Sequence, residues 1–105
     1  MSVSTHVLDS VVGRPAAGIA VRLFGGEELL AEGVTDHDGR CRLTEDATGL
    51  GTHRLVFATG AWFAEQDREA FYPEVVLTFA VSEPAEHHHV PLLLSPFAYS
   101  TYRGS

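Results

Sequence analysis

Apolar side chains recur at every second position through much of this 105-residue chain, and this spacing constrains the fold more than any other feature. The longest stripe runs through residues 75–81 and consists of Val75, Leu77, Phe79 and Val81. Shorter stripes run through residues 19–24 and 54–58. Successive side chains of a β-strand point to opposite faces, so each stripe predicts a strand with one buried face.

Turn-forming residues separate these stripes at short intervals. They lie at Gly13-Arg14-Pro15, Gly25-Gly26, residues 36–39 and residues 49–51. Further short strands are predicted at residues 4–9, 29–34, 41–43, 88–94 and 98–103. Many short strands divided by turns rich in Gly, Pro and Asp are typical of a sandwich or barrel and not of a parallel sheet. The chain is therefore predicted to be all-β.

One stretch, residues 62–71, departs from this period. Phe63, Ala70 and Phe71 fall at positions i, i+7 and i+8 with acidic residues between them, which predicts a short amphipathic helix. Tyr72-Pro73 should end it, because the residue before proline disfavours the helical region. The sequence contains no repeat or linker, so residues 1–105 are expected to form one domain.

Composition excludes several classes of function. The formal net charge is −7 and the seven Lys and Arg residues are scattered, which argues against binding to nucleic acid. No window approaches the ~20 apolar residues of a membrane helix, and the first residues do not resemble a signal peptide. Cys41 is the one cysteine, so no intrachain disulfide can form. A cytoplasmic protein without membrane contact is expected.

Histidine is unusually frequent. Six are present, and His87, His88 and His89 are consecutive. In a strand His87 and His89 would share one face while His88 faced the other. Such a pair could transfer protons near neutral pH, bind a metal, or simply begin a strand with polar residues. Zinc is the weaker interpretation, because no Cys or carboxylate stands at ligand spacing beside the triplet.

Two further side chains and the end of the chain could serve a site. His6 lies on the same strand face as Ser4 and Leu8, and Arg40 follows the Asp38-Gly39 turn. Each could be an ordinary surface residue, but a guanidinium is also well suited to hold a carbonyl or an oxyanion. Residues 99–105 alternate aromatic and hydroxyl side chains and could form either a docked tail or a plain edge strand.

Four segments resemble the motifs of one family. They are Ser4-Thr5-His6-Val7-Leu8-Asp9, Thr35-Asp36-His37-Asp38-Gly39-Arg40, His87-His88-His89-Val90-Pro91-Leu92-Leu93-Leu94-Ser95-Pro96 and Tyr102-Arg103-Gly104-Ser105. In this order they resemble the 5-hydroxyisourate hydrolases, also called transthyretin-like proteins, over essentially the whole chain. His88 is a departure, since a Tyr more commonly stands between the two outer histidines.

The resemblance implies a fold and an assembly. The fold is the transthyretin-like (prealbumin-like) sandwich of two antiparallel sheets with one short helix. The assembly is a homotetramer, a dimer of dimers, in which sandwiches pair through edge strands and the active sites lie in the channel where the dimers meet.

The resemblance also implies an activity without a metal or organic cofactor. It is the hydrolysis of 5-hydroxyisourate to 2-oxo-4-hydroxy-4-carboxy-5-ureidoimidazoline in urate degradation, by histidine-assisted attack of water on the six-membered ring. The residues carried over are His6, Arg40, His89, Tyr102 and Ser105. His89 is the first choice as general base, although His6 could also serve, and Arg40 would stabilise developing charge. Tyr102 and Ser105, through its hydroxyl or a terminal carboxylate, would hold His89 and the substrate.

Two other functions fit parts of the sequence. A non-catalytic carrier of a small aromatic ligand would share the fold, since fold does not determine function. It has no evident need for the histidines, Arg40 and the Tyr-Arg-Gly-Ser ending together. A metal-binding module built on residues 87–89 would leave Arg40 and this ending unexplained.

Overall fold

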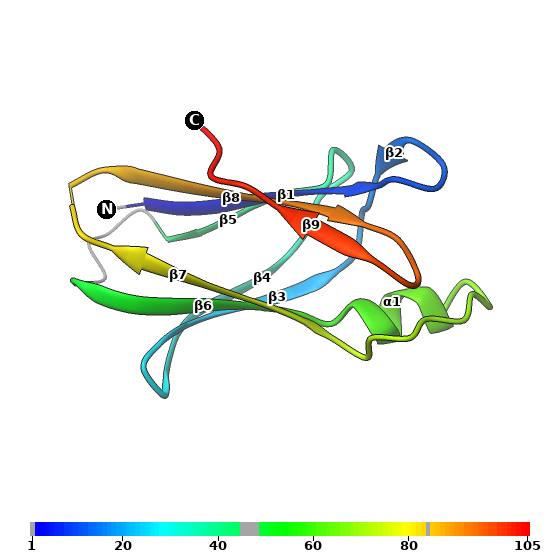
Figure 1. The fold of residues 1–105 in the computed structure, drawn as a ribbon, viewed down its shortest axis with the longest axis horizontal. Helices are drawn as coiled ribbons and strands as arrows, with labels where there is room; N and C mark the ends of the chain where they lie inside the picture. Colours follow the sequence, from blue (N-terminus) through cyan, green and yellow to red (C-terminus); the bar gives the residue numbers. More distant parts are fainter. Residues whose placement is uncertain (1, 45–48, 84) are drawn as a thin grey trace.

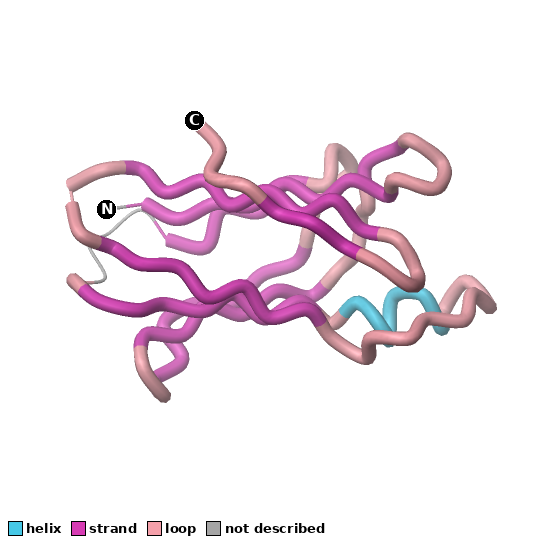
Figure 2. The backbone as a smooth tube through the Cα atoms, in the orientation of Figure 1, coloured by secondary structure: helices cyan, strands magenta, loops and turns pink. Residues whose placement is uncertain are grey.

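Two β-sheets face each other, with one short helix at one end of the sandwich (Figures 1 and 2). The computed structural model describes residues 2–44, 49–83 and 85–105. Its elements are β1 (Ser2–Asp9), β2 (Arg14–Pro15), β3 (Ala20–Gly25), β4 (Glu28–Val34), β5 (Arg40–Thr44), β6 (Gly51–Phe57), α1 (Thr59–Ala64), β7 (Val75–Val81), β8 (His87–Leu94) and β9 (Tyr99–Thr101). The predicted all-β sandwich is confirmed, with strand ends displaced by a few residues.

The first sheet carries strands from both ends of the chain. Its order is β2-β1-β8-β9, and β5 also pairs with β1; the second sheet has the order β4-β3-β6-β7. All pairs are antiparallel except β1 and β8, which run parallel in a register that places Ser4 opposite His89. The prediction of purely antiparallel sheets is therefore wrong for this one pair. Residues 14 and 15, predicted as a turn, also pair with β1.

The period-two pattern decides which face of each strand is buried. In β1 the odd-numbered residues from Val3 to Asp9 point into the sandwich, and the even-numbered ones from Ser2 to Leu8 remain partly exposed on the outer face. Inside, Leu23, Leu55, Phe57 and Leu92 are fully buried. Burial of such a side chain is worth about 1.5–3 kcal/mol, so the apolar interior holds the two sheets together. The outer face of the first sheet stays available for polar side chains.

The helix differs from the prediction of residues 62–71. α1 covers Thr59–Ala64, and the chain then turns through Asp67, whose φ of 55° lies in the left-handed region. The Arg68 N–H donates to the Phe63 carbonyl at 3.0 Å, a bond that closes helix ends of this kind. Phe71, predicted on the apolar face, is 70% exposed. None of the described residues forms a helix long and apolar enough to cross a membrane.

An ion pair holds the segment that follows the helix. The Arg68 guanidinium donates to the Asp9 carboxylate at 2.7 Å, and it also lies 4.8 Å from the centre of the Phe63 ring. Burial by itself raises the pKa of Asp9, but the hydrogen bonds from Arg68 and from the Val11 N–H outweigh it and leave that pKa lowered. The pair thus fastens the segment after α1 to the end of β1.

Candidate active site

Three of the predicted site residues lie on the outer face of the first sheet. His6 on β1 stands opposite Arg40 on β5, and Ser4, two residues before His6, stands opposite His89 on β8. Neighbouring strands are about 4.8 Å apart, and residues i and i+2 of one strand are about 7 Å apart. The sheet therefore gathers two imidazoles and a guanidinium from residues 6, 40 and 89 into one small area.

A tight turn sets the position of Arg40. The Asp36 carboxylate accepts from the N–H groups of Asp38 and Arg40, both at 2.9 Å, and these bonds lower the pKa of Asp36. Gly39 is required at this point, because its φ is +76° and a Cβ would lie 2.4 Å from the Val7 carbonyl oxygen. The turn is thereby held against β1, and the exposed Arg40 side chain begins beside His6.

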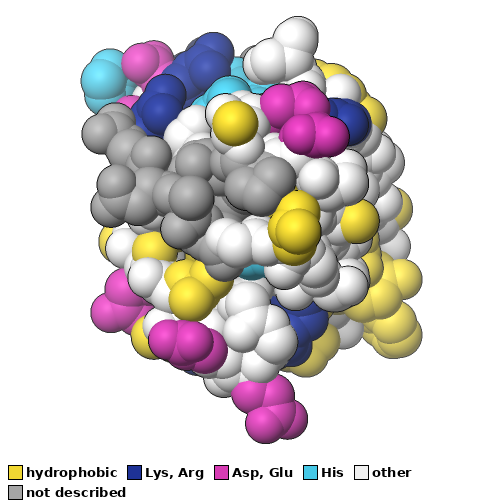
Figure 3. Space-filling view, turned by 90° about the vertical axis from the view of Figure 1, so that its left-hand side faces the viewer, with side chains coloured by type: hydrophobic (Ala, Val, Ile, Leu, Met, Phe, Trp, Pro, Cys, Tyr) yellow, Lys and Arg dark blue, Asp and Glu magenta, His cyan; other side chains and the backbone are white. Residues whose placement is uncertain are grey.

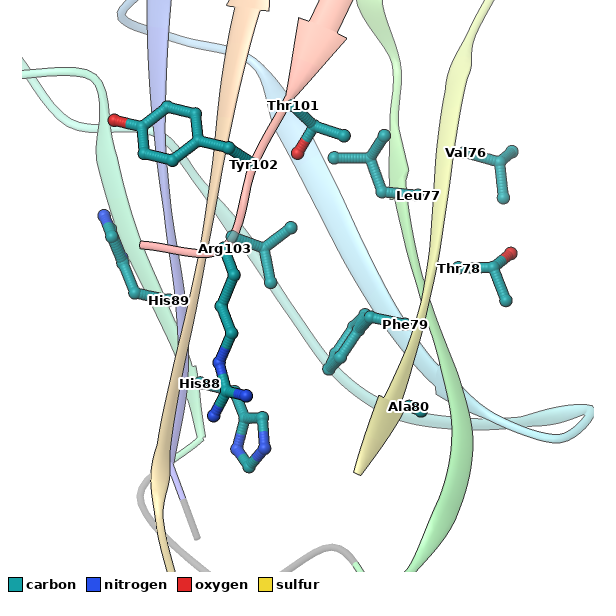
Figure 4. Close-up of a pocket in the computed structure, with 11 residues that line it drawn as sticks. Val76, Leu77, Thr78, Phe79, Ala80, His88, His89, Thr101, Tyr102 and Arg103 are labelled. Carbon is teal, nitrogen blue, oxygen red and sulfur yellow. The ribbon is translucent and has the colours of Figure 1, made fainter. Parts of the chain in front are cut away.

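The C-terminal tail, residues 102–105, passes across β8. The Gly104 N–H donates to the His89 carbonyl at 2.9 Å, and a Cβ on Gly104 would lie 2.5 Å from His89 Cδ2. The Tyr102 ring points to the same side of β8 as the His89 imidazole (Figure 4). Tyr102 and Ser105 are both exposed. The tail thus lies against the imidazole at its carbon edge.

A hydrogen-bonded row runs along the other edge of that imidazole. Ser4 Oγ lies 2.8 Å from His89 Nδ1 and 3.0 Å from His87 Nε2. His87 Nδ1 in turn contacts the hydroxyl of Ser2. The rings of His87 and His89 are stacked, with 6.2 Å between their centroids and 17° between their planes. Their shared face agrees with the sequence prediction.

The surroundings favour neutral imidazoles at both positions. Burial is the largest cause that lowers the pKa of His89, and repulsion from His87, Arg40 and His6 lowers it further. The pKa of His87 is also lowered, first by burial and then by Arg42 and His88. Groups that stay uncharged near pH 7 can accept protons there. Figure 3 shows histidine and basic side chains together along the edge of the first sheet, at the end where β8 begins.

His88 lies on the opposite face, as the alternation predicts. It is buried, its Nδ1 is 3.2 Å from the Glu86 carbonyl oxygen, and its ring lies 6.4 Å from that of Phe79. A cavity of about 420 Å³ opens on this side, between β7 and the strands β8 and β9 (Figure 4). Its lining includes His89 and Tyr102, but their side chains point away from it. This chain has His88 where a Tyr more commonly stands. Because His88 faces the cavity, the difference concerns the packing around the cavity and not the outer face.

Among the described residues, the histidine triplet does not form a candidate metal site. One group of titratable side chains is close enough to hold an ion, and it consists of the exposed Asp36, His37 and Asp38. In that group His37 is already paired with Asp38 at 3.3 Å.

The sequence did not identify three residues of this arrangement. Ser2 and Ser4 share the outward face with His6, which the alternation could have indicated, but their histidine partners lie more than 80 residues away. Gly104 was noted only as part of the Tyr-Arg-Gly-Ser ending, and its close approach to His89 is visible only in the structure.

Comparison with known proteins gives a consistent family. The sequence profile of the HIUase/Transthyretin family matches residues 3–104. A 5-hydroxyisourate hydrolase of Salmonella dublin is 44% identical over 108 residues, which are 97% of this chain and 79% of the relative.

Two solved structures share the fold. The Klebsiella pneumoniae 5-hydroxyisourate hydrolase superposes with a TM-score of 0.93 at 38% identity and full coverage of both chains. Sea bream transthyretin in complex with thyroxine superposes with a TM-score of 0.88 at 32% identity, covering 97% of this chain and 93% of that one.

Proposed function

Because the chain belongs to the HIUase/transthyretin family, we propose that the outer face of its first sheet is the active site of a 5-hydroxyisourate hydrolase. The product is 2-oxo-4-hydroxy-4-carboxy-5-ureidoimidazoline, an intermediate of urate degradation. The observation that carries the proposal is the meeting of His6, Arg40 and His89 on one small surface. Residues 1–105 would form this one hydrolase domain.

His89 is proposed as the general base. Water is a weak nucleophile at neutral pH, and a neutral imidazole that removes its proton typically accelerates attack by about 10²–10⁴-fold. The lowered pKa of His89 keeps the ring in this neutral form. Its Nδ1 is engaged by Ser4, so Nε2, the ring nitrogen farther from the strand, faces the reaction.

Arg40 and His6 would act on the substrate. Attack on the ring carbonyl places negative charge on oxygen, and a guanidinium that points at this oxygen stabilises the charge more in the transition state than in the ground state. His6, directly opposite Arg40, can orient the water or give a proton to the departing ring nitrogen. Their adjacency allows one flat substrate to contact both.

The tail would hold the imidazole and the substrate. Gly104 rests against His89, which limits rotation of the ring. The Tyr102 ring lies on the same side of β8 as His89, and the exposed Ser105 follows Gly104, so both would offer hydroxyl groups to the imidazole or the substrate. We also propose a cytoplasmic homotetramer, a dimer of dimers. A second pair of chains over this exposed face would shield the substrate and the attacking water from bulk solvent and turn the open surface into a channel.

The rival function is a carrier for a small aromatic ligand, and the likeness to transthyretin extends to the whole fold. Two imidazoles with lowered pKa values beside a guanidinium favour catalysis instead, because an apolar ligand gains little from them.

The test is the decay of freshly generated 5-hydroxyisourate, followed by ultraviolet absorbance with and without the protein. We expect a large acceleration that is lost in His6→Ala and in His89→Ala, by about 10²-fold or more each. His37→Ala, which removes an exposed imidazole from the turn, is the matched control and should retain activity. A folded tetramer that leaves the decay unchanged would support the carrier.

A further inference from the structure

Ser2, His87 and Ser4 form a hydrogen-bonded row that ends at Nδ1 of the His89 ring. We propose that Ser4, supported by His87, is a positioning residue that keeps a proton on His89 Nδ1 and so leaves Nε2 free to take the proton of water. The inference rests on the proposed function, because it concerns the same general base. It adds two residues, Ser4 and His87, whose side chains act through His89 and not on the substrate.

Counting protons leads to this assignment. Ser4 Oγ carries one hydrogen and lies within hydrogen-bonding distance of two imidazole nitrogens, His89 Nδ1 at 2.8 Å and His87 Nε2 at 3.0 Å. A hydroxyl donates one hydrogen bond and can accept two, so when both rings are neutral it donates to at most one ring and accepts from at least one. The tautomers of the two histidines are therefore linked through Ser4.

Three arrangements satisfy every bond. In the first, His89 Nδ1–H donates to Ser4, Ser4 donates to His87 Nε2, and His87 Nδ1–H donates to the hydroxyl of Ser2. In the second, all the donors and acceptors are reversed, and the proton of His89 moves to Nε2. In the third, both rings donate to Ser4 and Ser2 donates to His87 Nδ1, so His89 again carries its proton on Nδ1. Only the second arrangement removes the lone pair from Nε2, where a general base needs it.

The charges around the row favour a proton on His89 Nδ1 and a lone pair on Nε2. Among the described residues, His6 on β1 and Arg40 and Arg42 on β5 are the cationic or titratable side chains that face the row, with Tyr102 beyond β9. Repulsion from Arg40 and His6 opposes further protonation of His89, so a lone pair is preferred over an N–H on the ring nitrogen that points into this region.

The arrangement also stabilises the ring after it has reacted. Once Nε2 has taken a proton from water, the imidazolium carries hydrogens on both nitrogens, and Nδ1–H still donates to Ser4. Hydrogen bonds to a charged group are roughly twice as strong as those between neutral partners. No proton needs to cross Ser4 for this to occur.

The first experiment compares Ser4→Ala with Ser4→Thr. The alanine variant loses the acceptor, so we expect kcat to fall by about 10–100-fold while KM is unchanged, because the substrate is not contacted. The threonine variant retains the hydroxyl and should recover most of kcat. Equal losses in both variants, or a loss confined to KM, would overturn the assignment.

The second experiment is a double-mutant cycle with His87→Ala. Without its acceptor, Ser4 is free to donate to His89 Nδ1, which drives the base toward the wrong tautomer, so kcat should fall. Because His87 acts only through Ser4, the Ser4→Ala/His87→Ala variant should be no slower than Ser4→Ala alone. Multiplying losses would show that His87 acts independently and would contradict the proposal. His87→Gln, whose amide oxygen can accept, should retain activity.

The ¹⁵N resonances of the His89 ring separate this inference from the proposed function. They report which nitrogen is protonated in the free protein, whether or not 5-hydroxyisourate is turned over. We expect the neutral ring to carry its proton on Nδ1, and to gain an Nε2–H population in Ser4→Ala. A neutral His89 protonated on Nε2 in the unmodified protein would refute the inference even if the enzyme is active.

Discussion

The contact between Gly104 and His89 predicts that one added methyl group in the tail will impair catalysis without unfolding the protein. In Gly104→Ala the new Cβ would lie 2.5 Å from His89 Cδ2 and 3.2 Å from its Cγ. Carbon atoms need about 3.5–4.0 Å, so the ring or the tail must move by about 1 Å. A misplacement of this size can cost about 10²-fold in rate, which corresponds to about 2.7 kcal/mol of transition-state stabilisation.

The assay is kcat/KM for 5-hydroxyisourate together with a thermal melt of each variant. Gly104 lies outside the apolar core, so the melting temperature should hardly change while activity falls. Gly26→Ala is the matched control: its Cβ would meet nothing within 4 Å, but its φ of +60° makes alanine strained. It should lower the melting temperature and leave kcat/KM intact. Unchanged activity in Gly104→Ala would show that the tail does not position the imidazole.

Two further predictions concern stability. Arg68→Ala should reduce the free energy of unfolding by about 2 kcal/mol at pH 7, because it leaves the buried Asp9 carboxylate without its partner. The pKa of Asp9 is lowered by folding, so this contribution is present above the ordinary carboxyl pKa of 3.8 and is lost as pH falls through the folded value. Urea titrations at pH 7 and pH 3 should show the difference from the unmodified protein narrowing; an equal difference would contradict the ion pair. Thr35→Val should cost about 1–3 kcal/mol, because the buried hydroxyl accepts from Ile19 N–H at 2.9 Å and donates to the Ala16 carbonyl at 2.7 Å. A variant as stable as the parent would show that other groups satisfy these two partners.

The alternation of side chains predicted the strands well because it is a local property. It also predicted which residues of a strand share a face, including His6 with Ser4 and His87 with His89. Which strands lie side by side is not a local property. The pairing of β1 with β8, which brings Ser4 to His89, joins residues 85 positions apart and leaves no periodic trace in the sequence.

The helix shows how a tertiary contact overrides a local pattern. Phe63, Ala70 and Phe71 have helical spacing, yet the chain leaves the helix after Ala64. An aspartate tolerates the left-handed conformation better than most residues, and Asp67 adopts it. Directly after this turn Arg68 forms an ion pair with Asp9, which lies 59 residues earlier in the chain. The composition of the chain and the spacing of its apolar residues contain no information about the contact between Arg68 and Asp9.

The parallel pairing of β1 with β8 also determines when a growing chain could first become active. His6 and Arg40 come earlier in the chain than the strand that carries His89 and the tail that rests on it, and therefore emerge earlier in synthesis. Closing a pair so distant in sequence is slow, since the chain must lose the entropy of the long intervening loop before the contact is gained. A ribosome-bound fragment that lacks β8 would therefore contain His6 and Arg40 of the proposed site but not His89. The proposed site would be assembled only once β8 has paired with β1.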